Sequence, residues 1–169
     1  MISVVQSRLV RLGHLLGKHL RDRKRYKYPG DDGCPAEQEA MNDLSRQDHW
    51  EKVYTTRGEN QVSWFQETPA PSLELIGLVG AIRSSAIIDI GGGASRLVDC
   101  LVGQGYEDVT VLDLSAAALA SAQSRLGDKA NRAKWIAADV TAWEPARVYD
   151  LWHDRAAFHF LTESADKAA

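Results

Sequence analysis

The sequence predicts an α/β protein with a Rossmann-like parallel sheet and flanking helices. Two observations carry this prediction: short apolar runs alternate with stretches of helical periodicity, and an aspartate ends or closely follows each apolar run. Such alternation is typical of βαβ units, whose right-handed crossovers build a parallel sheet. The chain has 169 residues, of which 44% are hydrophobic and 25% charged, an ordinary composition for one globular domain.

Four strands are predicted from the apolar runs: Ala86–Ile90, Val109–Asp113, Lys134–Ala138 and Arg147–Trp152. Helices are expected between and around them: Ser45–Tyr54, Ser72–Gly80, Ser95–Val102, a helix capped by Ser115 that runs to Leu126, and another from Phe158 onward. Serine caps, glycine ends and prolines before the first turn are the signals used. Between the first two helices, residues 61–66 are expected to be extended.

The first 40 residues are predicted to form a basic helical arm and linker. Residues 41–169 are predicted to form a partial α/β domain. Eight basic residues against Asp22 give residues 1–28 a charge of +7, and the net charge of −3 leaves −10 for the remainder. Apolar residues at helical steps run from Ile2 to Leu16. Three interpretations of this arm stay open: contact with an anionic membrane surface, an organelle-targeting peptide, or a non-native addition before Met41.

Composition excludes several classes of function. No apolar run approaches the roughly 18 residues of a membrane span, so no integral membrane contact is expected. Cys34 and Cys100 are too few for a disulfide framework or a four-thiolate zinc site, which favours a reducing compartment and no metal. The arm holds only Tyr26 and Tyr28 as aromatics, so no nucleic-acid partner is expected. A cytoplasmic location is predicted, with organelle targeting as the alternative.

Acidic residues recur where the predicted strands end. Asp89, Asp113 and Asp139 end or directly follow the first three strands, and Asp154 follows the fourth. The carboxyl ends of parallel strands share one edge of the sheet, and ligands of open α/β sheets bind there. Each aspartate alone is equally well explained as a strand end or a helix cap. Together with a glycine loop, the set predicts a ligand site.

The glycine loop after the first strand favours one kind of ligand. Its sequence, Asp89-Ile-Gly-Gly-Gly93, fits a D-x-G-x-G pattern, whereas a dinucleotide fingerprint would need glycine at the position of Arg96. Asp89 would repel a diphosphate but not a zwitterionic, positively charged ligand. Asp113 lies about 20 residues beyond the loop, a spacing suited to a carboxylate that binds ribose hydroxyls in either cofactor class.

With these motifs in place, the sequence resembles the class I S-adenosylmethionine-dependent methyltransferases. Four segments carry the resemblance: Ile87–Ser95, Val111–Ser115, Ala137–Val140 and Tyr149–Arg155. Within that class, three further segments look like the branch of protein-lysine methyltransferases that act on elongation factors and citrate synthase: His49–Tyr54, Ser63–Gln66 and His153–Leu161. One departure is Ser95, which stands where the family has a third loop glycine.

The resemblance implies a role for each part of the site. Asp89, Gly91 and Gly93 would surround the methionine part of S-adenosyl-L-methionine, Asp113 its ribose, and Asp139 with Val140 its adenine. Trp50, Tyr54 and Trp64 would form a lid, although core packing explains Trp64 equally well. Asp154 is expected to orient the methyl acceptor, which by the branch resemblance is a protein lysine. His153 is a candidate base, and a packed histidine is at least as good an interpretation.

The resemblance also implies a seven-stranded sheet ordered 3-2-1-4-5-7-6, of which this chain supplies four strands. The fourth strand would then be an exposed edge bearing Val148, Leu151 and Trp152. Two classes of function remain open. The first is a methyltransferase, and the second a non-catalytic remnant or binding module that retains the cofactor half of the site. A nicotinamide-dependent oxidoreductase is a third, weaker alternative.

Overall fold

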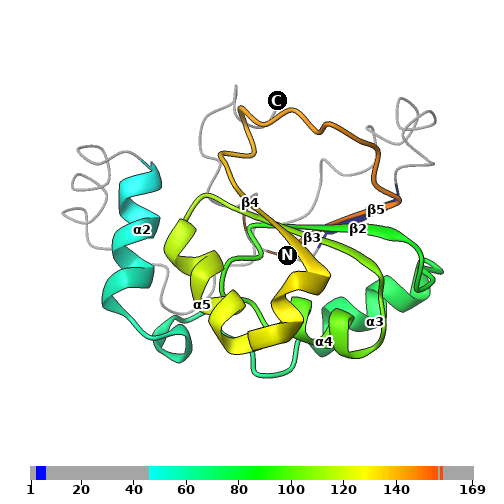
Figure 1. The fold of residues 1–169 in the computed structure, drawn as a ribbon, viewed down its shortest axis with the longest axis horizontal. Helices are drawn as coiled ribbons and strands as arrows, with labels where there is room; N and C mark the ends of the chain where they lie inside the picture. Colours follow the sequence, from blue (N-terminus) through cyan, green and yellow to red (C-terminus); the bar gives the residue numbers. More distant parts are fainter. Residues whose placement is uncertain (1–2, 7–45, 156, 158–169) are drawn as a thin grey trace, which may run out of the picture.

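The computed structural model describes residues 3–6, 46–155 and 157, and these form one sheet with helices packed on it (Figure 1). Within this part of the chain the sheet has five strands in the order β1-β5-β2-β3-β4. Their bounds are β1 Ser3–Gln6, β2 Ala86–Ile90, β3 Asp108–Asp113, β4 Ala133–Ala137 and β5 Leu151–Asp154. Strands β5, β2, β3 and β4 are parallel, whereas β1 pairs antiparallel with β5.

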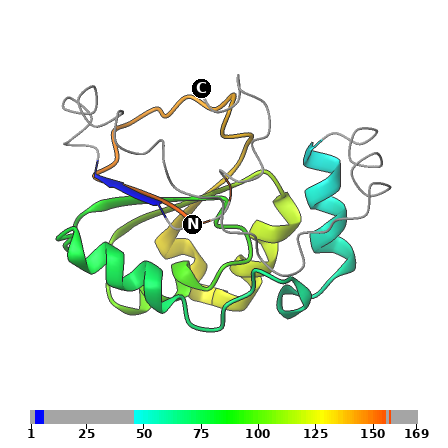
Figure 2. The ribbon, with the colours of Figure 1, turned by 180° about the vertical axis from the view of Figure 1, so that it is seen from behind.

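Three helices lie on one face of the sheet, as both views show (Figures 1 and 2). They are α3 Ala70–Leu78, α4 Leu97–Gly103 and α5 Ala116–Leu126. Helix α2, Arg46–Thr56, stands beside α5 at the edge where the strands end. Two short 3-10 helices, η2 Glu59–Gln61 and η3 Gly127–Arg132, complete the described elements. No helix of the described ranges has the length and apolar character that a membrane span requires.

The two faces of the sheet bury different sets of side chains. Ile87 of β2 packs with the helices, and its fully buried neighbour Ile88 points to the opposite face. This alternation follows the period of two along a strand. The second face is covered by residues 138–150, which are irregular. Three aromatic rings, with centroids 6.1 to 6.4 Å apart, fill the space there: Trp143, Tyr149 and Trp152.

The structure confirms the predicted fold class. The bounds predicted for β2 match, those for β3 differ by one residue at one end and those for β4 by one residue at each end. Helix α5 begins after its Ser115 cap and ends before Gly127, as expected. The order β5-β2-β3-β4 corresponds to positions 4-1-2-3 of the sheet that the resemblance implied. The helix expected from Phe158 lies outside the described residues.

Two local predictions are wrong. The fourth strand starts at Leu151 rather than Arg147, because Asp150 first binds the start of β2: its carboxylate accepts from Ala86 N at 2.9 Å, and its own N donates back at 2.8 Å. Val148, which precedes it, is 81% exposed. Residues 61–66 are not a strand, since Gln61 ends the 3-10 helix η2 and a turn follows.

The predicted exposed edge at the fourth strand is also wrong. Ser3–Gln6 form β1 and pair along β5, so the expected helix does not begin at Ile2. A strand there satisfies backbone N–H and C=O groups that β5 would otherwise leave open. Leu151 is buried and Trp152 half-buried. The remainder of the expected arm, residues 7–40, lies outside the described residues.

Candidate functional site

A pocket opens where β2, β3, β4 and β5 end, with α2 forming one side. Eight of the residues predicted for the site line it: Trp50, Tyr54, Asp89, Gly91, Asp113, Asp139, Val140 and His153. Trp64, the third aromatic of the expected lid, lines it as well. This position at the carboxyl edge of a parallel sheet is the one that the topology favours for a ligand. The fold therefore brings together residues that lie up to 103 positions apart in the sequence.

The glycine loop, residues 91–95, closes tightly onto two strand-end carboxylates. Gly91 N and Gly92 N both donate to Leu112 O, at 2.8 and 3.2 Å, which folds the loop over the end of β3. A Cβ at Gly92 would lie 2.6 Å from Asp89 Oδ2. A Cβ at Gly93, whose φ is +34°, would lie 2.6 Å from Asp113 Oδ2. Both positions require glycine because the backbone approaches the acids too closely for any side chain.

Arg125 of α5 holds the far end of this loop. Its guanidinium uses all five N–H groups: Nε and one terminal nitrogen donate to the Asp99 carboxylate at 3.0 and 2.7 Å, and the others bind Glu59, Ala94 O at 3.1 Å and Ser95 O at 2.9 Å. The side chain is only 16% exposed. One arginine thus ties the loop to α4, α5 and η2, and the planar fork of the guanidinium suits it to this task.

Asp113 is a buried acid that has no side-chain counter-ion within the described residues. Burial raises the pKa of its carboxyl from 3.8 to about 6; hydrogen bonds from backbone N–H groups, that of Ser115 first, oppose the rise, and the charge of Asp89 adds to it. Ser115 N donates to Asp113 Oδ1 at 2.8 Å. At mildly acidic pH this carboxyl group in the pocket wall is therefore partly protonated. A ligand hydroxyl that donates a hydrogen bond to it would stabilise its ionised form.

Asp89 and His153 form a buried pair across β2 and β5. His153 Nδ1–H donates to Asp89 Oδ1 over 2.7 Å, and the two side chains are 2% and 4% exposed. The Asp89 carboxylate accepts from Nδ1, so Nε2 is the ring nitrogen left for a further partner. His153 Nε2 is buried and has no hydrogen-bond partner within the described chain. A buried polar atom without a partner costs free energy, which a ligand group would recover.

Asp139 is more fully engaged than the prediction assumed. Its Oδ1 accepts from Thr141 N at 2.9 Å and Thr141 Oγ1 at 2.7 Å, and its Oδ2 accepts from Arg46 at 3.3 Å. Burial alone would raise the pKa of this carboxyl, but Thr141 and Arg46 outweigh that effect and hold it below its usual value. Val140, next to it, is half-buried on the second face and lines the pocket.

Three aromatic side chains stand over the pocket from α2 and the turn that follows it. The rings of Trp50 and Trp64 meet edge to face with centroids 5.5 Å apart, and Trp64 Nε1 donates to Tyr54 Oη at 3.1 Å. The helix is anchored by Glu51, whose carboxylate accepts from Ser115 Oγ at 2.7 Å and Ala117 N at 3.2 Å. A carboxylate at the N-terminus of α5 is also favoured by the helix dipole.

Asp154 and Gly93 are not among the described residues that line the pocket. Asp154 Oδ1 accepts from Ala157 N at 2.9 Å and so fixes the turn after β5. The sequence reasoning missed Arg46, Glu51, Arg125 and Arg155, and no local pattern marks the first three. Arg155 had one available signal, since it directly follows the strand-end Asp154.

The fold and the pocket define a Rossmann-like domain with a ligand site at the carboxyl edge of its sheet. Residues 87–169 match the family model described as "Methyltransferase domain". This stretch is just under half of the chain, and its match agrees with the resemblance to methyltransferases that the motifs carry.

Individual relatives are more distant. The "eEF1A lysine and N-terminal methyltransferase" of Bos taurus is 26% identical over 99 residues, which are 57% of this chain and 14% of that protein. The solved structure titled "Conversion of a Disulfide Bond into a Thioacetal Group during Echinomycin Biosynthesis" is 24% identical, with a TM-score of 0.56 over 73% of this chain and 53% of that one. The glycopeptide N-methyltransferase MtfA complexed with S-adenosyl-L-methionine is 23% identical, with a TM-score of 0.43 over 51% and 39%. The chain thus spans a seventh of the curated relative's length and about half or less of these structures.

Proposed function

We propose that this chain binds S-adenosyl-L-methionine in the pocket and directs its methyl group to a nucleophilic acceptor. The observation that carries the proposal is the glycine loop pressed against the Asp89 and Asp113 carboxylates, with less than 3 Å left for a Cβ at Gly92 or Gly93. This leaves backbone, rather than side chains, facing the pocket beside two acids. The methyltransferase domain match over residues 87–169 supports the same conclusion.

The proposed binding roles follow the strand ends. Asp113 accepts hydrogen bonds from the ribose hydroxyls, because its Oδ2 is not the oxygen that Ser115 N occupies. Asp89, Gly91 and Gly93 surround the methionine part. Val140 packs on the adenine ring, and Asp139 keeps lone pairs for an amino group beside the bonds from Thr141 and Arg46.

The lid and the end of β5 supply what methyl transfer still needs. The bound cofactor provides an already activated methyl group, so the chain mainly has to align the acceptor and exclude water. Trp50 and Tyr54 cover the pocket, and an aromatic face near a sulfonium contributes about 0.5–2 kcal/mol. When an amine attacks, its N–C bond forms as the S–C bond breaks and one N–H proton leaves. His153 Nε2 is the proposed acceptor of that proton, and Asp154 is proposed to orient the amine.

Titration calorimetry tests the proposal directly. Wild-type protein should bind S-adenosyl-L-methionine and S-adenosyl-L-homocysteine, and the Asp113→Asn variant should bind each at least about tenfold more weakly, since a charged hydrogen-bond acceptor is lost. NADH should give no heat. Absence of heat with millimolar S-adenosyl-L-methionine would refute cofactor binding, and binding of NADH alone would favour an oxidoreductase.

We further propose an amine acceptor, with a protein lysine as the first candidate. The support is the name of the bovine relative, a lysine and N-terminal methyltransferase, together with His153, which lines the pocket and whose Nε2 has no hydrogen-bond partner within the described residues. Incubation with methyl-labelled cofactor and a lysine-rich protein extract should transfer label to protein. Cofactor binding without transfer to any protein fraction would instead indicate a non-catalytic binding module.

A further inference from the structure

The ionisable residues of the pocket wall divide into those with a charged partner and those without. Six ionisable side chains, the tyrosine aside, line the pocket: Arg46, Asp89, Asp113, Asp139, His153 and Arg155. Arg46 binds Asp139, and His153 binds Asp89. Asp113 is met by backbone N–H groups. Of these six side chains, Arg155 is therefore the cation that has no charged partner among the other five.

Arg155 is half-buried, yet its guanidinium makes no hydrogen bond or ion pair within the described part of the chain. A guanidinium presents five N–H donors. By contrast, Arg125 finds an acceptor for each of its five. Within the described residues, the donors of Arg155 are thus available to a ligand group in the pocket that it lines.

The backbone around Arg155 lies directly against the glycine loop. A Cβ at Gly91 would come within 2.6 Å of Ala157 Cβ, and Asp154 Oδ1 fixes the turn by accepting from Ala157 N. Arg155 therefore sits beside the loop rather than at the outer rim. The charges of Asp113 and Arg155 both reach Tyr54, since they shift its pKa in opposite directions, although burial is the largest cause of the overall rise.

We propose that Arg155 binds the carboxylate of the ligand's amino-acid part, and so selects cofactors that carry this group. The inference rests on the proposed cofactor, whose methionine part would lie along the same loop. A guanidinium and a carboxylate form two parallel charge-assisted hydrogen bonds, a geometry that adds specificity as well as affinity. Asp113 then serves the ribose and Arg155 the carboxylate, so that each unpaired charge of the wall receives a matching ligand group.

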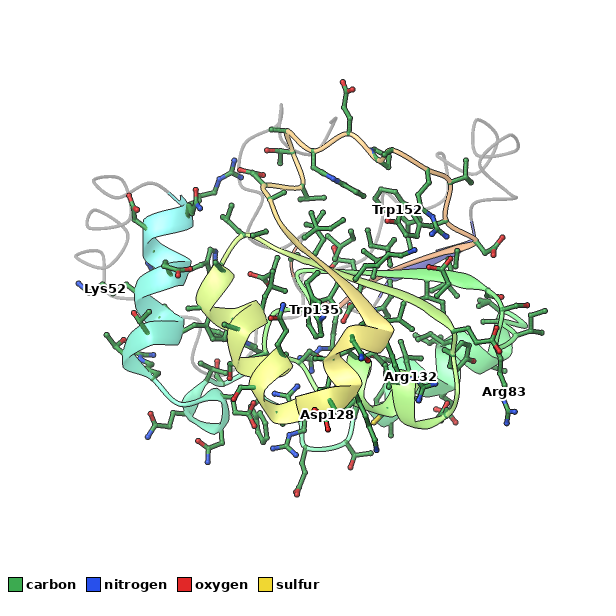
Figure 3. All side chains as sticks on the ribbon, viewed as in Figure 1. Lys52, Arg83, Asp128, Arg132, Trp135 and Trp152 are labelled. Carbon is green, nitrogen blue, oxygen red and sulfur yellow. The ribbon has the colours of Figure 1, made fainter. Side chains whose placement is uncertain are left out.

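The test compares S-adenosyl-L-methionine with decarboxylated S-adenosylmethionine, which lacks only the carboxylate. Both are titrated into wild type, Arg155→Met and Arg155→Lys, and into the control Arg132→Met. Arg132 lies in η3, where β4 starts, at the edge of the sheet opposite the pocket (Figure 3). Thermal unfolding curves establish that all four proteins are folded.

The expected result is selective. Arg155→Met should bind S-adenosyl-L-methionine about ten- to a hundredfold more weakly than wild type, in line with loss of a charge-assisted pair. Its affinity for the decarboxylated ligand should stay within twofold of wild type. Arg155→Lys should retain part of the preference, and Arg132→Met all of it.

Two other outcomes would overturn the inference while leaving the proposed function intact. One is an equal loss of affinity for both ligands in Arg155→Met, which would indicate a purely structural role. The other is an unchanged affinity for S-adenosyl-L-methionine. A wild-type protein that binds neither ligand would instead refute the proposed function itself, and this inference with it.

Discussion

Two walls of the pocket differ in whether their polar groups have hydrogen-bond partners within the protein. The glycine-loop wall, residues 91–95 with the N-terminus of α5, satisfies its polar groups internally through Arg125, Glu51 and Ser115. The β5 wall, residues 153–157, leaves His153 Nε2 and the Arg155 guanidinium without partners in the described chain. The first wall is complete without a ligand, whereas the second has groups that a ligand would complete.

The two walls therefore have different roles: the glycine-loop wall holds the shape of the pocket, and the β5 wall binds the ligand. Groups bound to other protein groups hold the loop in one conformation and have few hydrogen bonds left to offer. Groups without protein partners keep their hydrogen bonds available to a ligand, and a buried one such as His153 Nε2 gains most when the ligand arrives. Changes in the glycine-loop wall should therefore reduce stability and binding together, while changes in the β5 wall should reduce binding alone.

The largest effect is expected for Gly92→Ala in the glycine-loop wall. The new Cβ would lie 2.6 Å from Asp89 Oδ2 and 2.7 Å from Val111 Cγ1, so the loop must move. We expect a loss of about 3 kcal/mol in the free energy of unfolding, the upper end for overpacking, and no detectable cofactor binding.

Gly77→Ala is the matched control, because nothing lies within 4 Å of a Cβ at that position in α3. Alanine there should increase stability by about 0.5–1 kcal/mol through its higher helix propensity. Urea unfolding measures both variants. A Gly92→Ala protein as stable as wild type would show that the loop is not tightly held.

A smaller effect is expected for Arg125→Lys. Lysine has three donors for the five that Arg125 uses, so at least two acceptors of the loop region lose their partner. We expect unfolding to become easier by about 1–2 kcal/mol. Arg147→Lys is the control, since within the described residues Arg147 donates hydrogen bonds only to Asp108, stacks on the Tyr149 ring and is more exposed than Arg125; its cost should stay below about 1 kcal/mol. Equal losses would contradict a special role for Arg125.

The smallest effect concerns Asp113 and pH. Its carboxyl has a pKa of about 6 in the folded protein against 3.8 ordinarily, so the folded state binds the proton more tightly than the unfolded state. The resulting stability is fully present below about pH 4 and is lost as the pH rises through 6. Relative to Asp113→Asn, wild type should lose about 1 kcal/mol between pH 5 and pH 7. Parallel urea-unfolding stabilities of the two proteins across this range would refute the raised pKa.

Local sequence patterns predicted most of the fold because its elements carry local signals. The β2 run of apolar residues and the Ser115 cap with Gly127 were sufficient to place β2 and α5. The start of β5 could not be predicted, because the bonds between Asp150 and Ala86 join residues 64 positions apart. The pairing of Ser3–Gln6 with β5 is similarly non-local, and the apolar residues there also fit a helical period.

The candidate site was predictable to the extent that strand ends determine it. Asp89, Asp113 and Asp139 were found because parallel strands end at one edge. Arg125, Glu51 and Arg155 were not, since arginine and glutamate on helices and turns are common surface residues. Their importance arises only from what lies opposite them in the folded chain.

The position of β5 has a consequence for how the protein folds. Strands β2, β3 and β4 pair with near neighbours, such as Ala86 with Asp108, whereas β5 returns over 64 residues to pair with β2. Closing the longer loop costs about 1 kcal/mol more chain entropy, so we expect this pairing to form late. Because His153 and Arg155 come with β5, the pocket exists only after β5 has paired with β2. We expect unfolding to begin with the detachment of β5. A ligand bound in this pocket should therefore slow unfolding, because it contacts β5 and holds it against β2.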